Sequence, residues 1–467
     1  MKKTKLLVFI GLLPLLQACH ATYYQKQAKF HQLFLNSRLE EAEALLAKDK
    51  RATRRKTRLL YYLNRGTVAH LRGQYETSND FFEQAYLTHQ DFLAKPLDEA
   101  LAFIINPTVT DYRGEDHEVL LLHYYKALNF LQLGQRNAAL VECRRLNIKL
   151  HQLGDRYSSV EKYRRDAFVH TLMGLVYQAN HEYNNAFIAY RNAVEIYQED
   201  YQRLFGLPVP EQLKRDLVYT AYKTGLHDQV DHYQQMFNLA YNPAAEAVQG
   251  DVVVLWNNGL GPVKEEWDIN FVLVHGAGGV VTFSNEELGL CFPFPLPNNN
   301  ESGGLSDLKF LRVAFPKYRE RLLTYDRAVV HLPNGHQQAL EVLEDVNAIA
   351  FQVLQQRMVW ELGKSLLRTA TKKATEHLIR QQNQVLGAIV GGINFVTEKA
   401  DTRNWQTLPH SIYYTRLRLP AGTHQVTFEA AAGPLPYVEQ QRQTLHLQVS
   451  RGQTVFQLVH WPGTTAP

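Results

Sequence analysis

The strongest constraint on the fold is a pattern of small and aromatic residues that recurs through the first half of the chain. Its clearest copy consists of Gly174, Tyr177, Tyr183, Ala186, Tyr190 and Ala193. Small residues let two helices approach closely, and an aromatic residue one turn away fills the groove between them. The pattern therefore predicts paired antiparallel helices that bury one face against each other.

The pattern has the spacing of a tetratricopeptide repeat, and it occurs more than once. A second good copy consists of Gly66, Ala69, Gly73, Tyr75, Phe82 and Ala85. Weaker copies lie at 127–143 and 217–233, and a half-repeat lies at 30–46. We therefore expect an irregular tetratricopeptide-like α-solenoid over residues 30–242. Such arrays form concave surfaces that hold a peptide or another domain. The alternative is that the helices only support the second half of the chain.

The first nineteen residues have the organisation of a bacterial signal peptide. Lys2, Lys3 and Lys5 precede an apolar run over 6–15, which is too short to span a bilayer, and Ala18 precedes Cys19. The ending resembles the lipobox of bacterial lipoproteins, which implies cleavage after residue 18 and acylation of Cys19. An ordinary signal peptide or an uncleaved anchor is the alternative. His20 in place of Asp implies the outer membrane, so we expect a lipidated tether over 19–29.

Composition places the remainder among ordinary globular proteins. The chain is 45% hydrophobic and 21% charged, and its net charge of +4 does not favour a nucleic-acid partner. Cys143 and Cys291 fall in different halves, so we expect two separate buried thiols rather than a disulfide. The histidines lack the spacing of a zinc site. His275 and the glycines after it are not accompanied by a nucleophile elbow or by a phosphate-loop lysine. We therefore expect no catalytic residue, no cofactor and no metal.

Two charged segments interrupt the repeats. The residues that we single out as candidates for partner binding are Tyr112, Arg113, Glu115, Glu118, Glu142, Arg144, Arg145 and Asn147. Glu142 and Arg145 are three residues apart and can pair on one helix face, whereas Arg144 points elsewhere and could reach Glu115 or Glu118. The simpler interpretation is a salt-bridged joint between an insertion and a repeat, because charges on a helix are usually solvated or paired.

The pattern of the second half, 250–467, predicts a domain that mixes β-strands and helices. Short apolar runs predict strands at 252–256, 271–274, 280–283, 308–315 and 326–332, and proline and asparagine predict a loop over 292–304. A helical stripe over 340–369 and a second segment at 374–396 predict a helical hairpin over about 340–398. From residue 411 the period becomes two, which predicts a small antiparallel β-sandwich over about 411–460. The fold class is therefore α+β multidomain.

Several motifs together resemble an uncharacterised family of bacterial tetratricopeptide-repeat outer-membrane lipoproteins. They are the segments 112–118 and 141–147, a turn that ends in Lys264, and Asp401, Arg403 and Trp405 followed by Leu408 and Pro409. The resemblance covers nearly the whole mature chain and implies location and architecture, but no activity. Genes of the family often neighbour those of lipoproteins that activate penicillin-binding proteins.

The sequence thus predicts a non-catalytic outer-membrane lipoprotein that faces the periplasm and scaffolds an envelope complex. Its partners would be periplasmic or envelope proteins, with peptidoglycan machinery as a candidate, and the membrane through its lipid. The alternative is an envelope glycan-binding protein or hydrolase with Lys264, Asp401, Arg403 and Trp405 in a cleft. Against that alternative, Trp405 could fill the gap between helix and sheet while Asp401 pairs with Arg403.

Overall fold

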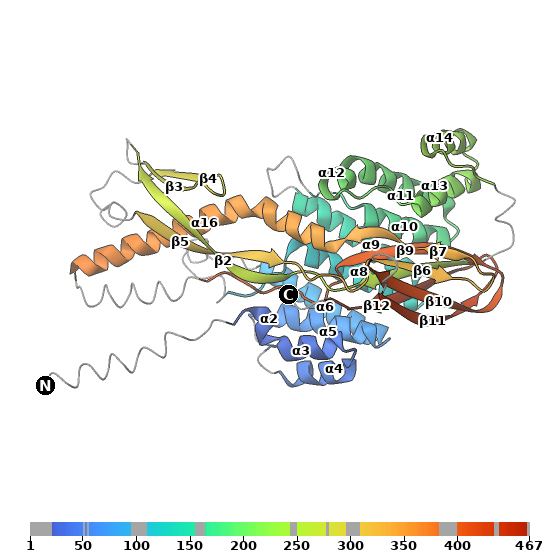
Figure 1. The fold of residues 1–467 in the computed structure, drawn as a ribbon, viewed down its shortest axis with the longest axis horizontal. Helices are drawn as coiled ribbons and strands as arrows, with labels where there is room; N and C mark the ends of the chain where they lie inside the picture. Colours follow the sequence, from blue (N-terminus) through green and yellow to red (C-terminus); the bar gives the residue numbers. More distant parts are fainter. Residues whose placement is uncertain are drawn as a thin grey trace.

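The computed structural model shows a helical array, a β-sandwich and a projecting arm (Figure 1). It describes residues 21–49, 52–53, 56–94, 110–154, 163, 165–242, 250–276, 280–295, 309–382, 399–433 and 439–464. The predicted signal peptide (1–18) and Cys19 lie outside these residues, as does the predicted domain boundary at 243–249.

The first half is helical, as the repeat pattern predicted. Its helices are α2 (Tyr23–Lys26), α3 (Ala28–Leu35), α4 (Leu39–Lys48), α5 (Arg58–Leu71), α6 (Tyr75–Ala94), α8 (Asp116–Gln132), α9 (Arg136–Gly154), α10 (Ala167–Ala179), α11 (Tyr183–Ile196), η3 (Tyr197–Tyr201), α12 (Gln202–Phe205), α13 (Glu211–Lys223) and α14 (His227–Phe237). Helical structure already begins at Tyr23, within the segment expected to be a tether.

The glycines of the two best repeats lie where helices touch. Gly66 of α5 faces Phe82 of α6, and a Cβ at Gly66 would lie 2.7 Å from the Phe82 ring. Gly174 of α10 faces Tyr190 of α11 so closely that a Cβ would overlap the ring. The pairs α5/α6, α8/α9 and α10/α11 are packed along their lengths. The tetratricopeptide-like prediction is therefore confirmed at its defining contacts.

A sandwich of two four-stranded sheets follows. The inner sheet has the order β12-β1-β9-β8, and the outer sheet has the order β11-β10-β6-β7. The inner strands are β1 (Gly250–Asn258), β8 (Glu341–Asp345), β9 (Ser411–Leu419) and β12 (Thr454–Trp461). The outer strands are β6 (Arg327–His331), β7 (Gln337–Ala339), β10 (Gly422–Ala432) and β11 (Glu439–Val449). β1 runs parallel to β12 and antiparallel to β9.

The inner sheet is buried on both faces. Val252, Val254 and Trp256 of β1 point into the sandwich core, whereas Val253 and Leu255 join the core of the helical repeats. This explains the continuous apolar run of β1, because a strand covered on both faces need not alternate. One side of the helical array is therefore occupied by the chain's own sheet.

The arm consists of a third sheet and one long helix. Its sheet has the order β4-β3-β2-β5, with strands β2 (Val263–His275), β3 (Val280–Asn285), β4 (Leu290–Pro295) and β5 (Phe310–Arg319). Helix α16 (Val346–Gln382) begins in the helical core and continues along the arm sheet, which it covers with Ala350, Leu354, Leu362 and Leu366. Figure 1 shows the arm projecting to the left of the repeats.

The structure corrects four details of the prediction. Residues 341–345 form strand β8 rather than the start of a helix. The helix then runs unbroken through 370–373, so the predicted turn of a helical hairpin is wrong, and 383–398 lie outside the described residues. The predicted loop at 292–304 begins as strand β4. The four terminal strands do not form a sandwich alone, because each sheet takes two of them and completes itself with earlier strands.

None of the described helices is both long enough and apolar enough to cross a membrane.

Candidate functional site

Two groups of candidate residues that are far apart in the sequence meet in one buried polar junction. Glu115 precedes helix α8, Lys264 lies at the start of β2, and these residues form an ion pair although 149 positions separate them. Arg357 of α16 joins them. Gly114 has φ +86, a left-handed conformation that suits glycine and turns the chain into α8. The junction thus links the repeats to both elements of the arm.

Glu115 is held as a carboxylate by two cations. Its Oε2 accepts a hydrogen bond of 2.7 Å from Arg357 Nη1, and its Oε1 pairs with Lys264. Burial raises the pKa of Glu115, but the charges of Arg357 and Lys264 outweigh burial and lower the pKa to about 2. The ammonium of Lys264 also lies 5.5 Å from the centre of the Tyr318 ring. Since the side chains of Glu115 and Lys264 are both buried, their ion pair is internal to the protein.

Glu118 lies beside it, and no cation of the described residues forms an ion pair with its carboxylate. Its Oε1 accepts from the Trp405 backbone N–H at 2.5 Å, and its Oε2 accepts from the Tyr112 hydroxyl at 2.7 Å. Burial and the negative charge of Glu115 raise the pKa of Glu118 to about 7. The same carboxyl group therefore ties the start of α8 to the segment that carries the C-terminal motif.

The C-terminal motif closes the other side of the junction. Asp401 and Arg403 form a two-point ion pair, with Arg403 Nε 2.8 Å from Asp401 Oδ1 and Nη2 2.7 Å from Oδ2. Arg403 Nη1 donates to the carbonyl oxygens of Lys56 and Thr110, and the guanidinium lies 5.3 Å from the centre of the Tyr112 ring. The prediction that Asp401 pairs with Arg403 is confirmed.

Trp405 lies in the loop that precedes β9, and its side chain is 1% exposed. Its ring packs against Phe82 and Tyr125, with centroids 5.8 and 5.6 Å away. Its Nε1 donates to the hydroxyls of Thr407 and Thr67. Trp405 is thus a packing residue, as the simpler interpretation expected, but its ring contacts lie on helices α6 and α8 rather than between helix and sheet.

The second charged segment forms a separate cluster on α8 and α9. Glu142 pairs with Arg145 at 2.9 Å, as predicted, and also with His123 at 2.7 Å and Lys126 at 3.0 Å. Burial raises the pKa of Glu142, but His123 and Lys126 outweigh burial and lower it. Arg144 does not reach Glu115 or Glu118. It donates to the Tyr177 hydroxyl instead, at 2.6 Å.

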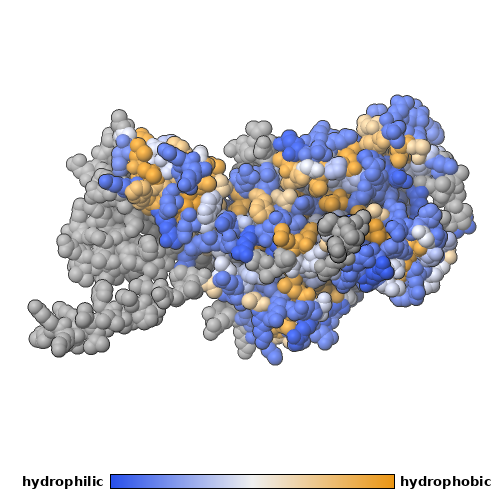
Figure 2. Space-filling model, in the orientation of Figure 1, coloured by the Kyte–Doolittle hydropathy of each residue, from blue (hydrophilic) through white to orange (hydrophobic). Residues whose placement is uncertain are grey.

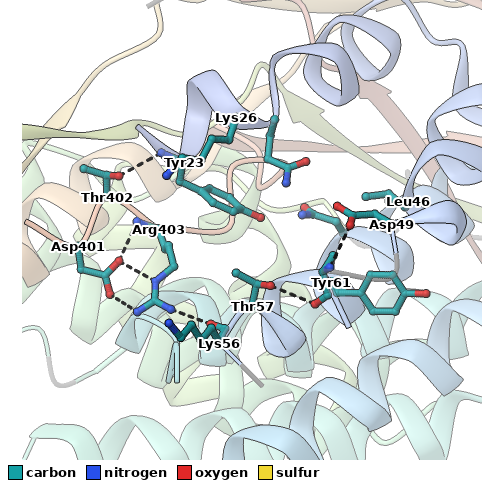
Figure 3. A pocket seen from close by; sticks show the side chains of 13 residues that line it. Tyr23, Lys26, Leu46, Asp49, Lys56, Thr57, Tyr61, Asp401, Thr402 and Arg403 are labelled. Carbon is teal, nitrogen blue, oxygen red and sulfur yellow. Dashed lines mark hydrogen bonds and ion pairs between the residues drawn. The ribbon is translucent and has the colours of Figure 1, made fainter. Parts of the chain in front are cut away.

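The remaining candidates lie at the margins of these clusters. The carbonyl of Arg113 accepts a hydrogen bond from His89, and its side chain is exposed. Asn147 is half-buried on α9. Of the proposed cleft residues, Asp401 and Arg403 line a cavity of about 350 Å³, but Lys264 and Trp405 do not (Figure 3). The structure therefore does not bring those four residues into one cleft.

The sequence analysis missed a buried ion pair that joins the sandwich to the repeats. Arg416 of β9 is 1% exposed in its side chain, and its Nε lies 3.0 Å from Asp216 Oδ1 of α13. Its other nitrogens contact Asp251, Gln178 and Tyr190. An arginine within the apolar strand 411–419 was the signal that could have found it.

Metal sites and cysteines give little further chemistry. Within the described ranges, no group of three or more histidine, cysteine, aspartate or glutamate side chains is placed to hold a metal ion. Cys143 is buried, and burial raises the pKa of its thiol to about 12. Cys291 is exposed, so the expectation that both thiols are buried is wrong for this residue.

Comparison with known proteins gives limited similarity. No protein-family model matches the chain, and no curated protein matches it in sequence. Among solved structures, BtubC (BKLC) from P. vanneervenii is similar at 16% identity and a TM-score of 0.28, over 47% of this chain and 78% of that one. A structure described as nearly identical TPR-like repeats of a putative kinesin light chain from Podosopora anserina is similar at 13% identity and a TM-score of 0.29, over 46% of this chain and 88% of that one. At these scores the fold assignment rests on the packing of this chain's own repeats.

Proposed function

We propose that this protein is a lipid-anchored, non-catalytic interaction protein of the cell envelope whose arm binds a partner protein. The observation that carries the proposal is an exposed apolar patch on the outer face of the arm sheet, formed by Val272, Val274 and Phe310. Their exposed fractions are 44%, 52% and 67%. Val272 and Phe310 are paired across β2 and β5, and Val274 lies two residues further along the same face.

The placement of this patch differs from that of the predicted partner-binding residues. Tyr112, Glu115, Glu118 and Glu142 are buried and bonded within the chain, and one side of the repeats is covered by the inner sheet. Isolated exposed apolar residues are common, but neighbours in register on one sheet face are typical of an interaction surface. Hydrophobic residues also gather over the arm in Figure 2. The partner surface is therefore on the arm and not among those residues.

The border of the patch favours a protein over an anionic membrane. Asp268 and Arg312 form an exposed ion pair of 2.6 Å in the same two strands, and Glu266 is exposed on the same face of β2. An apolar centre with a mixed-charge rim is the common organisation of protein interfaces. The partner is then a periplasmic or envelope protein, and the peptidoglycan machinery is the candidate that the resemblance supplies.

The test is crosslinking in cells followed by recovery of the tagged protein. Val274→Lys with Phe310→Lys should reduce partner recovery at least about tenfold, because two charges would be buried in an apolar contact. The matched control is Ile148→Lys on α9, which is 58% exposed but lies on the repeats. Loss of the partner in the control alone would contradict the arm assignment. Failure to recover any partner, with turnover of a glycan or peptide that Asp401→Ala abolishes, would favour the hydrolase.

The membrane anchor is a separate part of the proposal. It is supported by the basic start, the apolar run and Ala18–Cys19 of the sequence, and it places the protein on the periplasmic face of the outer membrane. Cys19→Ser should release the protein from the membrane fraction and remove the acyl mass from the mature N-terminus. Retention in the membrane with unchanged processing would contradict lipidation.

A further inference from the structure

A cavity of about 350 Å³ lies next to the first described helix, between α2, the start of α5 and the C-terminal motif. The residues that line it are Tyr23, Lys26, Gln27, Leu46, Asp49, Ala52, Lys56, Thr57, Tyr61, Asn64, Asp401, Thr402 and Arg403. Its volume lies at the lower end of the range for small-molecule sites, which suits a compact polar group. Figure 3 shows the Tyr23 hydroxyl directed into the space between Arg403 and Asp49.

The charged side chains that line the cavity favour an anionic ligand. Arg403 and Asp401 neutralise each other in their two-point pair. Asp49 uses one carboxylate oxygen to accept from the Ala52 backbone N–H at 3.1 Å. Lys26 and Lys56 are exposed, and within the described part of the chain no carboxylate forms an ion pair with either of them. Two ammonium groups at one cavity are a point-charge site suited to phosphate.

The surrounding sequence adds to this positive charge. Segment 49–58, which supplies four of the lining residues, contains six lysines and arginines and a single acid. Clusters of four or more such residues beside a membrane anchor attract anionic lipid headgroups. The local charge thus points away from a neutral or cationic ligand.

The cavity lies close in the chain to the proposed lipid anchor, which favours a phospholipid as the source of the phosphate. Tyr23 lines the cavity and is four residues from Cys19, a distance of at most about 14 Å for an extended chain. With the lipid proposed above on Cys19, this short tether keeps the cavity close to the bilayer surface. The remaining distance is comparable to the thickness of the headgroup layer plus one Debye length, so anionic headgroups can reach the cavity. We propose that this cavity binds the phosphate of an anionic phospholipid headgroup, which orients the protein on its membrane. This inference rests on the proposed lipid anchor.

The test uses the full chain as Cys19→Ser, so that no acyl group contributes to binding. Vesicles of phosphatidylglycerol mixed with phosphatidylcholine should bind it, and vesicles of phosphatidylcholine alone should not. Lys26→Glu with Lys56→Glu should weaken this binding at least about tenfold. The control is Lys29→Glu with Lys48→Glu, two exposed lysines nearby in the chain that do not line the cavity, and it should change binding by less than about threefold.

Each other outcome has a definite meaning. Equal loss in the two double variants would show diffuse surface attraction and overturn the site. Binding of inorganic phosphate at the cavity, with no preference for phosphatidylglycerol vesicles, would assign a free phosphate ligand and overturn the headgroup. Absence of vesicle binding while wild-type protein from cells carries an acyl group on Cys19 would overturn this inference alone. Absence of that acyl group would instead overturn the anchor.

Discussion

The body of the molecule and its arm contain the same kinds of residue but use them differently. In the body the inner sheet is buried on both faces, and its one arginine within the core, Arg416, is paired with buried Asp216. In the arm one face of the sheet is covered by α16 and the other exposes Val272, Val274 and Phe310. Buried charge and apolar contacts therefore stabilise the body from within, whereas the outer face of the arm sheet leaves apolar side chains and the Asp268–Arg312 pair exposed.

The largest expected contrast comes from ion pairs in the two regions. Asp216→Ala would leave the buried guanidinium of Arg416 with one partly exposed carboxylate, Asp251, and two neutral partners, and should lower the free energy of unfolding by about 3–5 kcal/mol. Asp268→Ala breaks an arm pair whose side chains are 39% and 53% exposed, and should cost about 0–1 kcal/mol. Urea denaturation measures both values. Equal losses would remove the distinction between body and arm.

The next effect is the pH dependence of the junction between body and arm. The folded-state pKa of Glu118 is about 7 against 4.5 for an unperturbed group, so the folded state holds this proton more tightly. Its stabilising contribution is complete below pH 4.5 and is lost as the pH rises through 7, a change of about 3 kcal/mol. Glu118→Gln should flatten the stability profile between pH 4.5 and 7.

Glu115 provides the opposite behaviour within the same junction. Its pKa of about 2 means that its contribution is present above pH 4.5 and is lost as the pH falls towards 2. Thermal or urea unfolding of wild type, Glu118→Gln and Glu115→Gln across pH 3–8 separates the two groups. A Glu118→Gln profile that keeps the full wild-type slope above pH 4.5 would show that Glu118 is already ionised.

A smaller contrast comes from one glycine in each region. Gly174→Ala in α10 would bring a methyl group into steric overlap with the Tyr190 ring and should destabilise the protein by about 1–3 kcal/mol. Gly363→Ala in α16 meets only Phe292, at 3.7 Å, and should stabilise the helix by up to about 1 kcal/mol. Chemical denaturation of the two variants gives the sign of each change. Stabilisation by Gly174→Ala would contradict close packing of the repeat.

Local patterns predicted the parts of the fold that depend on neighbouring residues. The glycine and aromatic spacing located the contacts Gly66–Phe82 and Gly174–Tyr190, because both partners belong to consecutive helices. The pairs Glu142–Arg145 and Asp401–Arg403 were also accessible, since they are three and two residues apart.

Contacts between distant segments were not accessible in this way. Nothing in the vicinity of Glu115 indicates that Lys264 and Arg357 will be its partners. The path of α16 was misread because the apolar stripe cannot show whether a helix turns back or continues along another sheet. The division of 411–460 between two sheets depends on β1 and β8, which come from earlier in the chain. Arg144 donates a hydrogen bond to the Tyr177 hydroxyl instead of pairing with Glu115 or Glu118, because the packing of α10 against α9 places that hydroxyl within reach.

The central claim, that the repeats are closed on one side by the chain's own inner sheet, can be measured directly by hydrogen exchange of the purified protein. Amides of β1 and β9 should be as protected as those of α8 and α10 and should exchange only with global unfolding. Amides of β2 in the arm should exchange earlier, because one face of that sheet is exposed. Exchange of β1 and β9 ahead of α8 and α10 would show that the inner sheet leaves the repeats, and would contradict the account.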